Sequence, residues 1–415
     1  MTDYFDTLEC RDPALREAAY MAALPGLIAH AQQNSPAAKQ ALADIDPTRI
    51  NSRAALATLP VTRKHELLER QSATRPADPF GGFSAVLRGR RMTRIFASPG
   101  PIYEPDVARQ DYWRVGRALF AAGFREGDLA HNAFSYHMTP GAYMMESGAH
   151  AIGCTVFPAG TGQTEQQLAA IADLRPDGYV GTPSFLRILI EKGLASGSDI
   201  SSFKRALVSG EAFPPSLRDW LAGNGIAGYQ CYATADLGLI AYETEARQGL
   251  VLDEGVIVEI VRPGTGDPVP EGDVGELVVT TLNLDYPLIR FGTGDLSAVL
   301  PGTCPTGRSN TRIKGWMGRA DQTTKIRGMF VHPGQVAEIV KRFPEVLKAR
   351  LVVTGEMAND ALTLKVEVSA SPPGLSARIG ETIRDVTKLR GDVDMLRPGS
   401  LPNDGVVIQD ARSYE

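Results

Sequence analysis

The middle of the chain alternates short apolar segments with amphipathic ones, and this alternation constrains the fold more than any other feature. CTVFPAG (154–160) is typical of a strand, and the segment that follows it, TEQQLAAIADLR (164–175), is typical of a helix. Strands that alternate with helices favour a parallel sheet with helices on its faces. Because ligands of such sheets bind beyond the carboxyl ends of the strands, we expect a site near three turns, ASPG (97–100), VSGE (208–211) and CYAT (231–234).

The regions on either side of this alternation have different patterns. Residues 1–93 are mostly polar, with apolar residues at helical spacing. Residues 251–300 contain only strand-like segments, of which GVIVEIV (255–261) and GELVVTTL (275–282) are joined by a turn-rich stretch. That stretch predicts a hairpin, so we expect a helical N-terminal region and a β-rich part.

The segment after residue 318 predicts a second, smaller unit. LVVTGEMANDALTLKVEVS (351–369) contains two alternating strands, and helix-like segments flank it. One strand face carries a row of apolar side chains, Leu362, Leu364, Val366 and Val368. We therefore expect an α/β protein with a large N-terminal domain, 1–318, that holds parallel sheets and the β-rich part, and a small α+β domain, 319–415.

Charge and composition exclude several classes of function. The chain has 43 basic and 48 acidic residues, a net charge of -5, which argues against a non-specific nucleic-acid binder or a protein of anionic membranes. We expect neither a signal peptide nor a membrane span, because no segment has the required apolar run. The 4 cysteines are far apart and the 6 histidines form no metal motif. This predicts a cytoplasmic protein without a structural zinc site.

Several motifs in fixed order identify the chain as similar to a known superfamily. SGEAFP (209–214), YPLIRFGTGDL (286–296) and GRADQTTKIRGMFVHPGQVAEI (318–339) carry most of the resemblance. Further matching segments are GTPSFLRIL (181–189), GTGQTEQQL (160–168), LPVTRKHEL (59–67), GELVVTTL (275–282) and RPGSLP (397–402). The chain resembles the adenylate-forming superfamily, and specifically its phenylacetate–CoA ligase branch, over nearly its whole length.

The resemblance implies a two-step reaction. Members of the superfamily form an acyl-adenylate from a small carboxylic acid and ATP, and then exchange AMP for coenzyme A. Their large N-terminal domain holds the acid and the nucleotide, and their small α+β domain is mobile and rotates between the two steps. The expected cofactors are therefore ATP or AMP, magnesium and coenzyme A. Relatives in this branch are often dimers, so a homodimer is possible.

The resemblance also assigns candidate nucleotide contacts. Asp295 is expected to accept hydrogen bonds from both ribose hydroxyls, for which an acceptor-only carboxylate is suited. Arg319 is expected near the ribose and the α-phosphate as a charged donor. Residues expected to surround the adenine are Gly210, Glu211 and Ala212 through their main chain and Tyr232 through its ring. Each of these residues also has an interpretation without a ligand. Asp295 could simply close a turn, Arg319 could be a surface cation and Tyr232 could be an aromatic residue of the core.

The second unit carries the remaining family positions. Asp321 resembles the hinge, and Lys325, Arg327 and Gly328 resemble the segment that faces the site during thioester formation.

The loop RIFASPGPIYEPD (94–106) departs from the family pattern. Relatives have a loop there that is rich in Ser, Thr and Gly, ends in a lysine and wraps the outer phosphates with backbone N–H groups. Here Pro99 and Pro101 remove two of those donors, and an acidic residue, Glu104, stands where a cation is expected. No lysine lies between residues 92 and 162. We expect a rigid tight turn at SPGP, with Ser98 and Gly100 as the candidate contacts to phosphate.

Two further positions depart from the family pattern. In YATAD (232–236), Ala235 replaces the hydroxyl residue, Thr234 lies one position early, and Asp236 replaces the glutamate that holds magnesium. The catalytic lysine near the C-terminus is also missing, because Val406 falls near its position and Lys388 is the last lysine. The catalytic residue is therefore unknown, and a substitute cation could be Arg397 or Arg412.

These features leave two hypotheses for function. The first is a working acyl-CoA ligase for an aromatic or medium apolar acid. Its acyl pocket is expected among the side chains of AFSYHMTPGAYMM (133–145), with Phe134, Tyr136, His137 and Tyr143 as candidates, although each could instead belong to the core. The second is an adenylation-deficient relative that binds an acid, an acyl-adenylate or a CoA thioester as an accessory protein.

Overall fold

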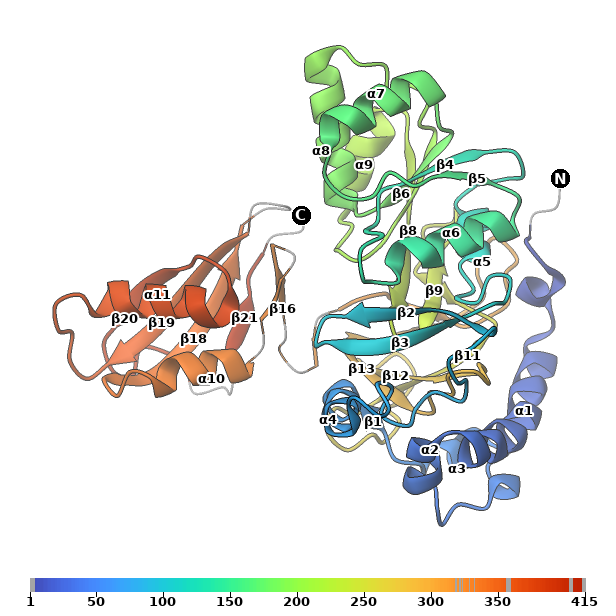
Figure 1. Ribbon diagram of the computed structural model, residues 1–415, viewed down its shortest axis with the longest axis horizontal. Helices are drawn as coiled ribbons and strands as arrows, with labels where there is room; N and C mark the ends of the chain where they lie inside the picture. The colour runs from blue at the N-terminus through green and yellow to red at the C-terminus, as the bar shows by residue number, and fades with distance from the viewer. Residues whose placement is uncertain are drawn as a thin grey trace. The chain divides into compact units, whose positions relative to one another are not determined.

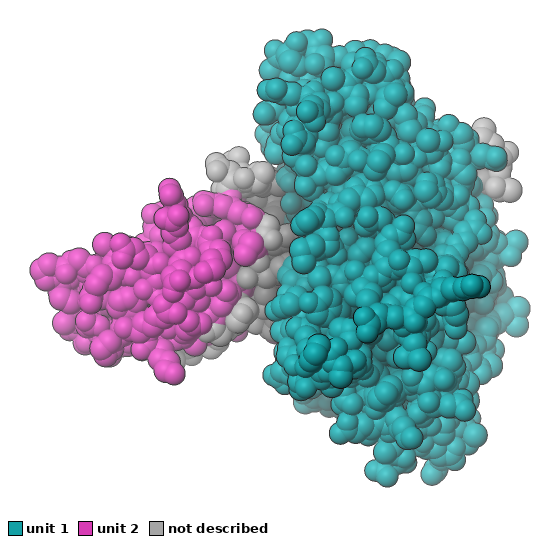
Figure 2. All heavy atoms as spheres, viewed as in Figure 1, with its two compact units in different colours: residues 1–317 teal, residues 318–415 magenta. Residues whose placement is uncertain are grey.

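The computed structural model divides the chain into two compact units, residues 1–317 and 318–415 (Figure 2). The residues that the structure describes are 4–317, 319–320, 322, 324–327, 329–331, 333–355, 360–402 and 406–412. Figure 1 shows the helices and strands of each unit and labels many of them.

The N-terminal region is helical, as the sequence predicts. Its elements are η1 (Thr7–Cys10), α1 (Pro13–Asn34), α2 (Pro36–Ala41), η2 (Pro47–Arg49), α3 (Arg53–Ala57), β1 (Thr62–Arg63) and α4 (Lys64–Thr74). The carboxylate of Asp12 caps α1, because it accepts hydrogen bonds from the backbone N–H groups of Ala14 and Leu15. The buried face of α1 packs on the β-rich part through a core that includes Leu24, Ile28, Ile257 and Ile289.

A parallel sheet forms the centre of the first unit, as the alternation predicts. Its strands are β4 (Leu129–Asn132), β5 (Thr155–Phe157), β6 (Gly178–Gly181), β7 (Arg205–Val208) and β8 (Ala227–Thr234). They lie in the order β8-β7-β6-β4-β5, and each neighbouring pair is parallel. Helix α5 (Gly116–Ala121) precedes β4, and the helices that connect the strands are α6 (Gly141–Ala151), α7 (Thr164–Leu174), α8 (Pro183–Ser196) and α9 (Pro215–Gly223) (Figure 1).

Helix α5 is shorter than its sequence pattern suggests. The pattern DYWRVGRALFAAGF (111–124) is helix-like throughout, but α5 begins only at Gly116. The reason is the carboxylate of Asp111, which accepts hydrogen bonds from the backbone N–H groups of Val115 and Gly116. An aspartate that binds nearby backbone N–H groups competes with the helix and delays its start.

The ASPG turn does not lie at the end of a parallel strand, so that expectation was wrong. Strands β2 (Met92–Ser98) and β3 (Ile102–Val107) form a separate antiparallel pair, with Ser98 opposite Ile102. The tight turn expected at SPGP is present, and it returns the chain directly along β2. Because the chain reverses at once, β2 pairs with its own neighbour in sequence and no helix follows it.

The β-rich part supplies two further groups of strands. A mixed sheet has the order β1-β13-β12-β11, and it contains β11 (Val256–Val261), β12 (Gly275–Thr281) and β13 (Phe291–Ser297). The predicted hairpin is confirmed, because β11 and β12 pair antiparallel. Antiparallel strands that extend the parallel sheet beyond β8 are β9 (Gly238–Glu243), β10 (Leu250–Leu252), β15 (Arg312–Ile313) and β14 (Val299–Leu300).

The second unit is an α+β unit, as predicted. A sheet of order β20-β19-β18-β21 contains β18 (Val346–Thr354), β19 (Ala361–Val368), β20 (Asp392–Leu396) and β21 (Ile408–Asp410). The other elements are the hairpin β16 (Thr324–Ile326) and β17 (Met329–Val331) and the helices α10 (Pro333–Lys341) and α11 (Leu375–Thr387). Leu362, Leu364, Val366 and Val368 belong to or pack against one core, which confirms their shared face. Among the described residues, no helix is long and apolar enough to cross a membrane.

Arg290 connects the helical N-terminal region to the β-rich part. Its side chain is 2% exposed, and its Nε lies 3.0 Å from Oε2 of Glu259. The same guanidinium donates hydrogen bonds to the backbone carbonyl groups of Ala57, Leu59 and Gly266. These bonds satisfy a charge that would otherwise be buried without partners.

We predict that Arg290→Ala lowers the free energy of unfolding of the first unit by about 3–5 kcal/mol, because it leaves the Glu259 carboxylate buried and unpaired. Urea unfolding measures this change. The control is Arg53→Ala, which removes an exposed ion pair with Glu17 and should lower the free energy by at most about 1 kcal/mol. Equal effects of the two substitutions would contradict this role of Arg290.

Candidate functional site

Asp295 is held in a fixed orientation by two side-chain donors. It lies on β13, and its Oδ2 accepts a hydrogen bond of 2.6 Å from the hydroxyl of Tyr232. Its Oδ1 accepts a hydrogen bond of 3.1 Å from the indole Nε1 of Trp316. The donors come from β8 and from the segment that follows β15, so three distant parts of the chain meet at this carboxylate. Asp295 is thus not simply a turn residue.

Tyr232 and Thr234 lie at the end of β8. The half-buried ring of Tyr232 packs against the core beneath the β-rich part, while its hydroxyl contacts Asp295. The Oγ1 of Thr234 accepts a hydrogen bond of 3.1 Å from the backbone N–H of Leu237, which closes the turn toward β9. The Tyr232 hydroxyl therefore has a role that the sequence did not indicate.

The SGE segment begins directly after β7 and meets the start of α8. Gly210 has a positive φ of 82°, a conformation that glycine adopts without strain. Glu211 is exposed, and its Oε2 accepts a hydrogen bond of 2.5 Å from the hydroxyl of Ser184. Phe134 approaches the same place, because its ring lies 3.9 Å from the point where a Cβ at residue 210 would stand. The motifs SGEAFP and GTPSFLRIL therefore contact each other through Glu211 and Ser184. The predicted pocket residue Phe134 lies beside them.

Glu104 is turned into the protein and away from solvent. It is 0% exposed, and its Oε1 accepts a hydrogen bond of 2.5 Å from the hydroxyl of Ser98. Burial, with a smaller contribution from the carboxylate of Asp236, raises the pKa of Glu104 to about 8. The side-chain hydroxyl of Ser98 is therefore engaged within the loop, and the acidic residue faces inward.

Lys64 is a site residue that sequence reasoning missed. Its Nζ lies 2.9 Å from Oδ2 of Asp236, whose side chain is almost fully buried. The two residues are 172 positions apart, so a search for a lysine within the loop could not find this pair. The only indication was the motif LPVTRKHEL, which contains Lys64 but gave no role for it.

Two of the predicted acyl-pocket residues, Tyr136 and Tyr143, form an aromatic cluster with a polar centre. The hydroxyl of Tyr136 donates a hydrogen bond of 2.7 Å to Oε2 of Glu146 and accepts one of 2.9 Å from Nδ2 of Asn132. The rings of Tyr136 and Tyr143 meet edge to face, with centroids 5.2 Å apart. Burial and the Glu146 carboxylate raise the pKa of Tyr136. His137 is exposed.

The predicted residues of the second unit are described only in part. Asp321 and Gly328 lie outside the described residues, and so does the side chain of Lys325, whose backbone belongs to β16. The backbone N–H of Arg327 donates a hydrogen bond of 2.9 Å to Oδ2 of Asp360.

The cations considered as substitutes for the missing lysine have different surroundings. Arg412 forms ion pairs with Asp360, at 3.2 Å, and with Asp410. Arg397 is exposed. Val406 precedes β21, and Arg319 is half-buried at the start of the second unit.

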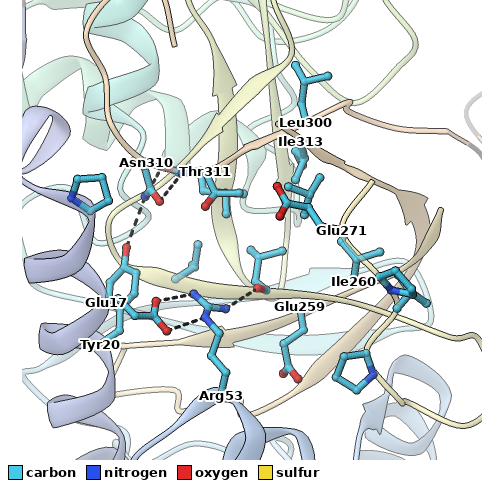
Figure 3. Close-up of a pocket in the computed structure, with 18 of the residues that line it drawn as sticks. Glu17, Tyr20, Arg53, Glu259, Ile260, Glu271, Leu300, Asn310, Thr311 and Ile313 are labelled. Carbon is cyan, nitrogen blue, oxygen red and sulfur yellow. Dashed lines mark hydrogen bonds and ion pairs between the residues drawn. The ribbon is translucent and has the colours of Figure 1, made fainter. Parts of the chain in front are cut away.

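A pocket of about 760 Å³ lies elsewhere in the first unit (Figure 3). Its walls come from α1, α3, β11, β14 and β15, and they include Tyr20, Glu259 and Asn310. Figure 3 shows Arg53 bound to Glu17 in this pocket. None of the predicted site residues lines it. The candidate site is therefore located by its predicted residues and not by this pocket. These residues include side chains at the carboxyl ends of β7 and β8 and on β13.

Comparison with known proteins first defines the class. The family profile described as AMP-binding enzyme matches residues 112–284. A crystal structure of 2-hydroxyisobutyryl-CoA ligase in complex with its acyl-adenylate and CoA has a similar fold, with a TM-score of 0.83 and 23% identity, and covers 100% of this chain and 93% of that one. The amide bond synthetase McbA from Marinactinospora thermotolerans is more distant, with a TM-score of 0.55 and 18% identity, and covers 75% of this chain and 66% of that one. The fold is that of adenylate-forming enzymes.

Sequence relatives then define the family. The phenylacetate–coenzyme A ligase of Thermus thermophilus is 34% identical over 366 residues, which cover 83% of this chain and 80% of the relative. The phenylacetate–coenzyme A ligase of Escherichia coli is 30% identical over 403 residues, which cover 90% and 89%. The chain therefore belongs to the phenylacetate–CoA ligase family, and it is an AMP-forming, ATP-dependent acyl-CoA ligase. Nothing in these comparisons favours the adenylation-deficient alternative.

We predict that Lys64 and Asp236 are energetically coupled, because the lysine neutralises a buried carboxylate. In a double-mutant cycle of Lys64→Met and Asp236→Asn, urea unfolding should give a coupling energy of about 1–3 kcal/mol. The control cycle uses the exposed pair Arg187 and Glu191, for which about 0.3–0.5 kcal/mol is expected. A coupling between Lys64 and Asp236 no larger than that of the control pair would contradict the contact.

Proposed function

We propose that this ligase activates an aromatic or medium apolar carboxylic acid. The carboxylate of the acid attacks the α-phosphorus of ATP, which forms the acyl-adenylate and releases pyrophosphate. The thiol of coenzyme A then attacks the acyl carbonyl and releases AMP. The support for an aromatic acid is the aromatic cluster around Tyr136 and Tyr143, together with relatives named for phenylacetate and for 3-hydroxybenzoate.

The orientation of Asp295 is the observation that carries the nucleotide part of the proposal. Both of its carboxylate oxygens already accept hydrogen bonds from uncharged donors, which places them as two adjacent acceptors. The two hydroxyls of a ribose would offer the same kind of donors. We assign Asp295 to the ribose and Arg319 to the ribose and α-phosphate.

The adenine is assigned to the segment after β7. Gly210, Glu211 and Ala212 would line it through their main chain, and Tyr232 would contact it beside the ribose. The hydrogen bond from Ser184 to Glu211 supports this assignment, because it fixes the exposed segment against the start of α8.

The phosphates are assigned to the loop after β2 and to the cation next to it. Ser98 and Gly100 remain the candidate loop contacts. Lys64 would supply the ammonium group that the loop itself lacks, and its ion pair with Asp236 holds that group in place. Asp236 is also the candidate ligand of magnesium, and its Oδ1 has no hydrogen-bond partner among the described residues, which fits that role. Magnesium bound with ATP would offset charge on the phosphates.

We assign to the second unit the movement that switches the enzyme from adenylate formation to thioester formation. We propose that residues 1–318 act as the domain that holds the nucleotide, that 319–415 act as the mobile domain, and that Asp321 is the hinge. Lys325, Arg327 and Gly328 would face the site during thioester formation. Val406 lies near the position of the catalytic lysine of the family, and a valine side chain cannot supply its charge. Another residue must therefore promote the attack of the carboxylate on ATP, and we assign this role to Lys64.

We further propose a cytoplasmic homodimer. The cytoplasmic location is supported by the 4 cysteines, which are all free thiols and would be at risk of oxidation elsewhere. The homodimer is proposed from the resemblance to the family. Analytical ultracentrifugation would measure the mass of the assembly in solution.

Pyrophosphate exchange with a panel of acids tests the proposed reaction. We expect ATP-dependent exchange with an arylacetate or benzoate and none with short polar acids, because the aromatic cluster favours apolar rings. Lys64→Ala should lower the exchange rate by about 10²–10³-fold, the usual loss for one aimed charge at a transition state. Exchange with no acid of the panel would contradict the proposal, and an unchanged rate in Lys64→Ala would contradict the role of the lysine.

Calorimetry with AMP and 2′,3′-dideoxy-AMP tests the ribose assignment. Asp295→Ala should weaken binding of AMP by at least about tenfold, because hydrogen bonds to a carboxylate contribute about 1.5–3 kcal/mol. The same substitution should leave binding of the dideoxy analogue nearly unchanged, since that analogue has no hydroxyl to donate. Equal losses for both ligands would show that Asp295 acts through the fold and not through the ribose.

Trp316 should compete with the ribose for Asp295. Its indole N–H occupies one carboxylate oxygen, so Trp316→Phe removes a donor that AMP must displace. We predict that this substitution strengthens AMP binding by about 2–10-fold, the range for one hydrogen bond in water. Calorimetry measures the change, and weaker binding in the variant would contradict the competition.

A further inference from the structure

Asp295 lies where β13 bulges out of regular pairing with β12. The register of the two strands shifts between Glu276 and Val278. As a result, residues 293–295 of β13 all lie opposite Leu277 of β12. A bulge takes residues out of the regular ladder and can re-aim a side chain, so the orientation of Asp295 depends on the bonds that hold the bulge.

Two residues of β12 hold this bulge. The Oε1 of Glu276 accepts a hydrogen bond of 3.3 Å from the backbone N–H of Gly294. The hydroxyl of Thr293 donates a hydrogen bond of 2.9 Å to the carbonyl of Leu277, and it accepts one of 3.1 Å from the backbone N–H of Asp295. The side chain of Glu276 is 2% exposed, so water does not compete for its bond.

The same oxygen of Glu276 forms an ion pair with Arg63. Arg63 lies on β1, which pairs with β13 on the side opposite β12, so the ion pair crosses over β13. The crossing point is Gly292, the residue that faces Arg63 in the parallel register. A Cβ at Gly292 would lie 2.8 Å from both Nη1 of Arg63 and Oε1 of Glu276, so the ion pair fills the space that a side chain would need.

Arg63 also fixes the start of the helix that carries Lys64. It is the last residue of β1, and Lys64 is the first residue of α4. The backbone N–H of Arg63 donates a hydrogen bond of 3.0 Å to Oε2 of Glu66, in the first turn of α4. One side-chain contact and one backbone contact thus anchor the residue before Lys64. Glu276 therefore joins the start of α4 to the bulge that contains Asp295.

We propose that Glu276 is a positioning residue for the adenylation step. Through Arg63 it holds the start of α4, and with it Lys64. Through Gly294 it holds the bulge, and with it Asp295. One buried carboxylate thus sets the spacing between the cation assigned to the phosphates and the acceptor assigned to the ribose, an inference that rests on the proposed function. A misplacement of about 1 Å can lower a rate by about 10²-fold, so this spacing matters for catalysis.

The double substitution Arg63→Met/Glu276→Gln, called the neutral variant below, tests this role in the full chain. It removes both charges together, so neither is left buried without a partner, and the glutamine side chain still offers an acceptor to Gly294. With an acid that supports pyrophosphate exchange, the kcat of exchange should fall by about 10–10²-fold. The KM for the acid should change by less than about twofold, because none of these contacts involves the aromatic cluster.

The matched control is Arg175→Met/Asp199→Asn. It removes an exposed ion pair of the same unit and should leave both kinetic parameters unchanged.

The Lys64→Ala background separates positioning from a purely structural role. If the neutral variant acts through Lys64, its two substitutions should change the exchange rate of Lys64→Ala by less than about twofold, because a group that has been removed cannot be misplaced. Equal losses in the wild-type and the Lys64→Ala backgrounds would show a purely structural effect and would overturn the inference.

A second readout needs neither acid nor nucleotide. The coupling between Lys64 and Asp236, measured by urea unfolding, should be at most about half as large in the neutral variant as in the wild type, because α4 then lacks its anchor. An unchanged coupling overturns the inference. Exchange with no acid of the panel contradicts the proposed function instead, and the coupling still decides the inference.

Circular dichroism checks that the neutral variant is folded. If it is not, Glu276→Gln alone is the second variant. It keeps the acceptor for Gly294 and leaves the charge of the partly exposed Arg63, and it should lower both the exchange rate and the coupling. Wild-type values of both in a folded Glu276→Gln would likewise overturn the inference.

Discussion

The carboxylate of Asp295 is the group on which the proposed nucleotide site depends. It joins β13 to the end of β8 through Tyr232, and to the segment before residue 318 through Trp316. The Tyr232 hydroxyl holds one oxygen of this carboxylate in place, so a ribose would not have to order the whole group on binding. The loop with Tyr136 follows β4 and the segment with Gly210 follows β7, so the parallel sheet that contains both strands sets their spacing.

The proposed phosphate region uses different residues from those that the family pattern suggests. Prolines occupy the loop, and Ser98 is engaged with Glu104. The cation proposed for this region is Lys64, which lies on a helix that precedes the loop in sequence. The carboxylate of Asp236 holds its ammonium group. The charge has thus moved from the loop to a neighbouring element, and the acidic residue in the loop is buried. Under the proposed assignment, Lys64 would serve the phosphates in place of a loop lysine.

Patterns within short stretches of sequence predicted the elements whose structure depends on neighbouring residues. The alternation from residue 94 onward predicted the parallel sheet, and the turn-rich stretch between β11 and β12 predicted their hairpin, because periodicity and turn residues act over a few positions. The loop at Ser98 was placed wrongly, since a strand that ends in a tight turn looks the same whether a helix or its own partner follows. Motifs in order predicted the family and, through it, the reaction.

The side-chain contacts of the site were harder to predict. The pair Lys64 and Asp236 joins positions 172 residues apart, and the contact of Trp316 with Asp295 involves an exposed aromatic that no pattern marks. Neither contact leaves a periodic trace in the sequence. The decisive measurement is a crystal structure of the protein with bound AMP. Both ribose hydroxyls should donate to the carboxylate of Asp295, and the indole of Trp316 should be displaced from it. A ribose bound elsewhere, while Trp316 still donates to Asp295, would contradict this role of Asp295.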